Sequence, residues 1–105
     1  MSTPTDTDRT LLTVMASMRA LPGQEEVLRQ ALEALVEPTR GDRGMVSYNL
    51  HRGVHDPGLF CFYENWTSEE ALEEHLAAPH LANLVSDLDG VIDGEIVIHR
   101  VARIA

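Results

Sequence analysis

The chain has 105 residues, of which 44% are hydrophobic and 24% charged, proportions typical of one small globular domain. Seventeen acidic residues face only eight basic ones, and the net charge of −9 argues against nucleic acid or an anionic membrane surface as a partner. No apolar run is long enough to cross a bilayer, and the first ten residues do not resemble a secretory leader. The single cysteine allows no internal disulfide, so we expect a cytoplasmic protein.

The first half of the chain alternates between extended and helical patterns. We expect residues 1–10 to be a disordered tail and residues 11–105 to form one domain. Apolar residues alternate over residues 11–19, which predicts a strand. A Leu-Pro-Gly turn follows, and apolar residues at helical spacing predict a helix that begins at Gln24 and is stopped by Pro38.

Two further strands are predicted at residues 45–52 and 59–66, joined by the six-residue connection GVHDPG. Within the second of these, a period of two places Phe62, Glu64 and Trp66 on one face. A buried carboxylate needs a partner, and we expect Glu64 to pair with Arg52 or Arg19.

A helix follows the third strand directly. Thr67 is the predicted N-cap, with Glu70 three residues on completing a capping box. Helical spacing then defines an inward face, made of Ala71, Leu72, His75 and Leu76. Pro79 should end this helix and begin a shorter one, followed by a loop over residues 90–94 and a last strand over residues 95–104.

This order predicts an α+β fold of the ferredoxin-like β-α-β-β-α-β type, in which helices cover one face of a four-stranded antiparallel sheet. The opposite face also carries apolar side chains, and so short a chain has nothing left to cover it. We therefore expect a homodimer in which two sheets pack face to face.

Three segments together resemble the antibiotic biosynthesis monooxygenase family: GMVSYNLHR, FCFYENWTSEEAL and HLAAPH. The resemblance extends over residues 11–104. It implies a dimeric α+β barrel with the ligand held between the sheet and the helices of one subunit. Members include cofactor-independent quinol and anthrone monooxygenases, haem-degrading enzymes and isomerases. The haem-degrading members have an asparagine on the first strand where this chain has Ala16, which places haem degradation below the quinol interpretation.

The resemblance also implies site residues. Trp66 lies where several members carry a pocket tryptophan, and His75 and His80 match the histidines of the HLAAPH segment. We expect His75 to be the catalytic base, because its ordinary pKa lies close to neutral pH. Trp66, the other expected catalytic residue, can stack on a planar ring and donate its indole N–H.

Further residues are candidates for binding the substrate. They are Ser17, Tyr48, Asn49, Phe62 and His80. The chemistry requires an electron-rich aromatic substrate and O₂ as co-substrate, with no cofactor. No close-spaced pair of ligands suggests a metal site.

Two other functions are compatible with the same residues. One is an isomerase acting on a small hydroxy-carbonyl compound, with the histidines transferring protons and no oxygen consumed. The other is a ligand-binding or dimerising module without catalysis, in which Trp66 only lines the cavity.

Overall fold

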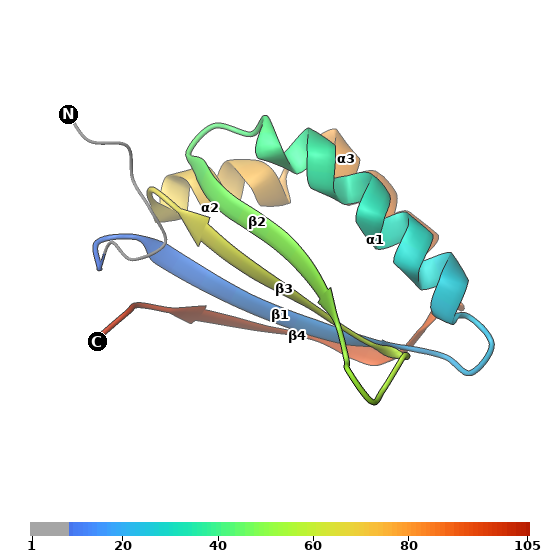
Figure 1. Cartoon of the computed structure of the whole chain (residues 1–105). Coiled ribbons are helices and arrows are strands. Elements are labelled where there is room, and N and C mark those ends of the chain that lie inside the picture. Colours follow the sequence, from blue (N-terminus) through green and yellow to red (C-terminus); the bar gives the residue numbers. More distant parts are fainter. Residues whose placement is uncertain (1–8) are drawn as a thin grey trace.

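The computed structural model describes residues 9–105 and contains four strands and three helices. These elements are β1 (Leu12–Ala20), α1 (Glu25–Arg40), β2 (Met45–Arg52), β3 (Leu59–Trp66), α2 (Glu69–Leu76), α3 (Pro79–Asp87) and β4 (Ile92–Val101). The strands form one antiparallel sheet in the order β2-β3-β1-β4, and all three helices cover the same face (Figure 1). The predicted ferredoxin-like α+β fold is confirmed, with the second helical segment divided into α2 and α3.

The predicted tail falls mostly outside the described residues, which begin at residue 9. Within residues 9–105, no helix is both long and apolar enough to cross a membrane.

Strand register separates the side chains of the sheet into two sets. On β1, Val14 and Met18 point toward the helices and are almost fully buried, whereas Met15 is 49% exposed on the opposite face. On β3, the residues predicted to share one face point toward the helices, because Phe60, Phe62, Glu64 and Trp66 are each at most 5% exposed. One layer of core therefore lies between the sheet and the helices, and within residues 9–105 no layer covers the other sheet face (Figure 1).

Two predicted helix boundaries were wrong. Helix α1 continues through Pro38 to Arg40, since a proline in the last turn removes only one backbone donor near the point where the ladder ends anyway. Helix α2 is capped by Ser68 and not by Thr67: the Ser68 hydroxyl accepts a hydrogen bond from the Ala71 backbone N–H at 3.1 Å. Thr67 instead donates its backbone N–H to the Gly44 carbonyl.

The last strand also begins earlier than predicted. Strand β4 starts at Ile92, inside the segment expected to be a loop. Its pairing with β1 shifts between Ser17 and Arg19, where β4 uses more residues than β1 to cover the same length. Gly94, with φ of 78°, lies in this irregularity. A glycine that suggests a turn in the sequence thus forms a bulge within a strand.

Candidate functional site

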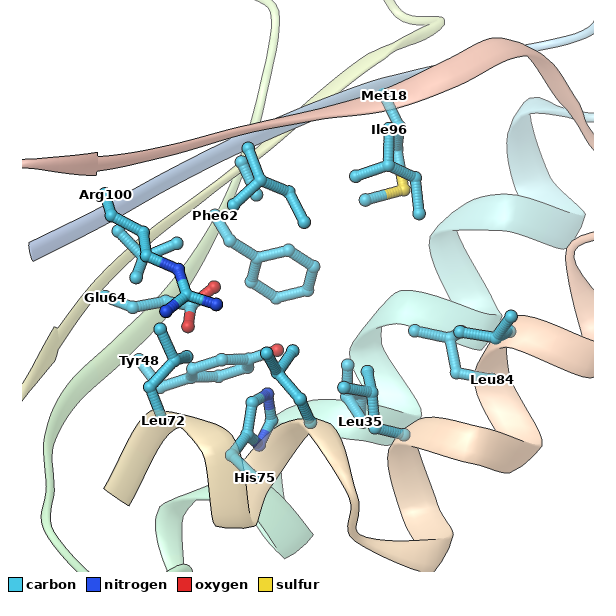
Figure 2. A pocket seen from close by; sticks show the side chains of 16 residues that line it. Met18, Leu35, Tyr48, Phe62, Glu64, Leu72, His75, Leu84, Ile96 and Arg100 are labelled. Carbon is cyan, nitrogen blue, oxygen red and sulfur yellow. The ribbon is translucent and has the colours of Figure 1, made fainter. Parts of the chain in front are cut away.

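A cavity of about 170 Å³ lies between the inner sheet face and helices α2 and α3 (Figure 2). Most of its lining is aliphatic or aromatic. Its polar or charged lining residues are Tyr48, Glu64, His75 and Arg100. The cavity opens to the surface, since Val85 and Ile98, which line it, are each more than half exposed. This combination of an apolar wall and a few converging polar groups is typical of a small-molecule site.

His75 lies at the floor of this cavity, on the inward face of α2. Its side chain is 3% exposed, and its Nδ1 lies 2.8 Å from Asp42 Oδ2. His80, at the start of α3, places Nε2 2.9 Å from the same oxygen. Burial lowers the pKa of His75 more than the neighbouring carboxylate raises it, so the imidazole is mainly neutral near pH 7.

The loop between α1 and β2 brings Asp42 to these histidines. Gly44 ends this loop with φ of 78°, a conformation that favours glycine. A Cβ at this position would come within 2.5 Å of the Ala71 Cβ and 2.6 Å of the Thr67 Oγ1. The loop therefore packs tightly against α2 at Ala71, one turn before His75, and this packing places Asp42 beside the His75 ring.

Glu64 is the second ionisable group in the cavity wall. It is 5% exposed, and its Oε1 accepts a hydrogen bond from Trp66 Nε1 at 2.9 Å. The predicted ion pair with arginine is wrong: Arg19 pairs with Asp56, and Arg52 pairs with Glu26. Burial without a cationic partner raises the pKa of Glu64 to about 7. The carboxyl group can therefore gain or lose a proton near neutral pH.

Aromatic rings hold these groups in place. The Trp66 ring is fully buried and lies against the His75 ring, with 4.7 Å between centroids. Tyr48 contacts both of these rings and Phe62. Burial raises the pKa of Tyr48 far above neutral, so its hydroxyl keeps its proton and can act as a donor.

We compared the chain with known proteins to find the family to which it belongs. The profile of a family described as "Antibiotic biosynthesis monooxygenase" matches residues 11–86. The chain belongs to the antibiotic biosynthesis monooxygenase family. A relative in Mycobacterium tuberculosis, named "Putative monooxygenase Rv0793", is 36% identical over 70 residues, which cover 67% of this chain and 68% of the relative.

Solved structures agree with this family membership. PA3566 from Pseudomonas aeruginosa matches with a TM-score of 0.87 and 34% identity, over 91% of this chain and 96% of that one. The structure of Rv0793 matches with a TM-score of 0.84 and 27% identity, over 90% and 96% of the two chains.

In this family member, the residues predicted for the site fall into two groups. His75, Tyr48 and Phe62 line the cavity, and His80 lies behind His75. Trp66 lies directly behind the wall, with its N–H already bonded to Glu64. The N–H is therefore not free to donate to a ligand while this bond is intact.

The other two candidates lie outside the cavity. Register places Ser17 of β1 and Asn49 of β2 on the uncovered sheet face. Asn49 accepts a hydrogen bond from Arg40 at 3.3 Å. The face of β2 that lines the cavity is the one that carries Tyr48.

Asp42 was missed by the sequence reasoning, because it lies in a polar loop more than thirty residues before His75. It completes a group of three ligand-type residues, Asp42, His75 and His80, with one ligand atom each within 4.8 Å of the others. These residue types can bind zinc or a similar ion, and their convergence could not be recognised from their spacing in the sequence. The two nitrogen–oxygen distances are nevertheless those of hydrogen bonds.

Proposed function

We propose that this protein is a cofactor-independent monooxygenase that oxidises a quinol or a similar electron-rich aromatic compound with O₂. The observation that supports it is that His75 and Glu64 both line one apolar cavity. A substrate that reduces O₂ by itself needs only deprotonation, exclusion of water and stabilisation of its anion. The family membership supports oxygen chemistry in general terms.

The reaction balances with the protein's own groups. Neutral His75 takes a proton from the quinol hydroxyl, and the protonated Tyr48 hydroxyl is a donor available to the resulting anion. The anion transfers one electron to O₂, and the two radicals combine at a ring carbon to form a peroxide. Protonated His75 returns its proton to the peroxide anion, which becomes a hydroperoxide. Neutral His75 then takes the proton from the ring carbon that bears the hydroperoxide, the O–O bond breaks, and Glu64, partly protonated near pH 7, protonates the departing hydroxide. The substrate gains one oxygen atom as a carbonyl, and the other leaves as water.

Cavity size narrows the substrate class. A closed cavity of about 150 Å³ accommodates one benzene ring. The present cavity of about 170 Å³ opens to the surface on one side, so a single ring or a naphthalene-type bicycle fits best. A tricyclic anthrone would have to extend through the opening, and a haem is larger still. Ala16, in place of the asparagine of haem-degrading members, lies in the cavity wall.

Oxygen uptake tests this proposal. We expect metal-free, flavin-free protein to accelerate oxygen uptake on reduced benzoquinones and naphthoquinones, and to act more slowly on anthrones because of the cavity's size. The product should carry one added oxygen, and catalase should not return oxygen, because the second atom leaves as water. Uptake no faster than spontaneous oxidation across the whole panel would refute the proposal.

A second candidate is an isomerase. Two proton carriers, His75 and Glu64, line one cavity, and such a pair could remove a proton from one atom and return it to another. Turnover of a hydroxy-carbonyl compound under argon would favour this function.

We further propose that the protein is a homodimer formed by the uncovered sheet face. Met15 of β1 and Val97 of β4 lie on that face, and each is 49% exposed. Exposed apolar groups on a sheet with no covering layer suit a second copy of the same surface.

Light scattering after size exclusion provides the test. We expect the wild type to have the mass of two chains and V97E to shift it toward one, because a carboxylate would have to be desolvated in the interface. V54E is the matched control, since Val54 is 90% exposed in the hairpin between β2 and β3. A monomeric wild type would contradict the proposal.

A further inference from the structure

We propose that Asp42 is the positioning residue of the site, and that Asp42 and His80 together hold His75 in the tautomer that carries its proton on Nδ1. The inference deepens the proposed function and rests on it for its catalytic meaning. Asp42 and His80 contact each other and His75 from outside the cavity. They lie behind His75 and line no part of the cavity wall.

The tautomer follows from the hydrogen bond. An ionised carboxylate can only accept, so the 2.8 Å contact between Asp42 Oδ2 and His75 Nδ1 requires a hydrogen on Nδ1. A neutral imidazole has one N–H, and Nε2 is then an acceptor. An isolated neutral histidine prefers the opposite tautomer, so the carboxylate reverses the preference. His75 projects from α2 toward the cavity (Figure 2), and Nε2 becomes the nitrogen that can take a proton from a substrate.

His80 contributes by fixing the carboxylate. Its Nε2 lies 2.9 Å from the same Asp42 oxygen, so two imidazoles from different helices bind one atom. His80 is 24% exposed and Asp42 is 17% exposed, so the carboxylate is within reach of solvent. Without a second donor, Asp42 could rotate toward water and leave His75 Nδ1 unpaired. Pro79 begins α3 and places His80 in its first turn.

A bound metal ion is the competing interpretation of these three residues. An ion bonded to all of them would need Nδ1 of His75 without its hydrogen, and Nε2 would then carry the proton. The two interpretations therefore predict opposite tautomers for His75. The observed contacts favour hydrogen bonds, because both nitrogens lie within 2.9 Å of a single oxygen.

Imidazole ¹⁵N spectra of the substrate-free protein at pH 7.5 test the inference directly. We expect the wild type to show His75 with Nδ1 protonated and Nε2 unprotonated. D42N should lose this preference and show a mixture or the opposite tautomer, because an amide is uncharged and can present either an acceptor or a donor. H80Q should keep it, since an amide N–H can replace the imidazole donor, whereas H80A should weaken it.

Two controls show whether a change in the His75 signals is specific and whether each variant is folded. H55A changes an exposed histidine of the hairpin and should leave the His75 signals unchanged. Circular dichroism identifies variants that fail to fold, and H80Q then remains as the mildest test. A wild-type His75 with its proton on Nε2, or a zinc titration that moves the His75 and His80 signals at stoichiometric metal, would overturn the inference.

Turnover gives the second, independent result. If quinol oxidation occurs, D42N should lower kcat by about 10²-fold or more with little change in KM, because the base is disoriented while the cavity wall is intact. A D42N enzyme with wild-type kcat would overturn the positioning role. If no quinol is oxidised but His75 carries its proton on Nδ1, the proposed function fails and the structural inference stands.

Discussion

Replacing His75 by Ala should lower quinol-dependent oxygen uptake by about 10²–10⁴-fold, the usual contribution of a well-placed general base. The physical reason is that His75 is mainly neutral at pH 7 and is the one imidazole that lines the cavity within residues 9–105. Oxygen-electrode rates with the best quinol of the panel, measured under saturating substrate, would give the loss in kcat.

Chemical rescue distinguishes a base from a packing residue. The H75A variant removes a buried ring from beside Trp66, and free imidazole added to the solution can occupy the space. If imidazole partly restores the rate of H75A, and H55A is active without added imidazole, then His75 is the base. If H75A retains its activity within a few-fold and remains folded, the base is another group, with Glu64 the next candidate.

Replacing Glu64 by Gln should change the free energy of unfolding in a pH-dependent way. The value for E64Q minus the value for the wild type should be about 3 kcal/mol larger at pH 8 than at pH 4. The pKa of Glu64 rises from an ordinary value of 4.5 to about 7 on folding, and each pKa unit corresponds to about 1.4 kcal/mol. Between these values the folded protein keeps a proton that the unfolded chain has released. Wild-type stability therefore falls as pH rises through this window and levels off above about pH 7 to 8, whereas Gln removes this dependence.

Urea unfolding of both proteins at several pH values, at one protein concentration, measures this difference. The comparison with Gln is needed because His75, whose pKa is lowered, acts in the opposite sense and destabilises the fold as pH falls below 6.5. E95Q, at an exposed position on β4, is the matched control and should not change the pH profile. Parallel wild-type and E64Q curves would mean that Glu64 is ionised in the folded protein at pH 6.

Most of the fold could be predicted from the sequence because the signals are local. Alternation along β3 identified the side chains that share one face, and Pro79 marked the division between α2 and α3. The errors occurred where one residue type serves two purposes. Pro38 is compatible with the last turn of a helix as well as with its end, and Gly94 suits a bulge as well as a loop.

The site was harder to predict, because its decisive contacts are not local. His75 was identified from its place on the inward face of a helix, but the residue that orients it comes from a distant loop. The segment Gly-Asp-Arg-Gly indicated only a polar turn or loop, which does not reveal the residues that Asp42 contacts. Ser17 and Asn49 were chosen by residue type alone, and only the register of the strands shows which face they occupy.

Trp66 is the single tryptophan of the chain, and it is fully buried against Glu64 and His75 of the site. Its indole N–H is bonded to Glu64 and its ring lies against His75. When the protein is excited at the long-wavelength edge, where its two tyrosines absorb little, the emission comes from one chromophore at the cavity wall. Protonation of either neighbour, or entry of an aromatic compound that accepts the excitation energy, changes the brightness or colour of that emission. The protein thus contains its own optical probe for screening ligands without an added label.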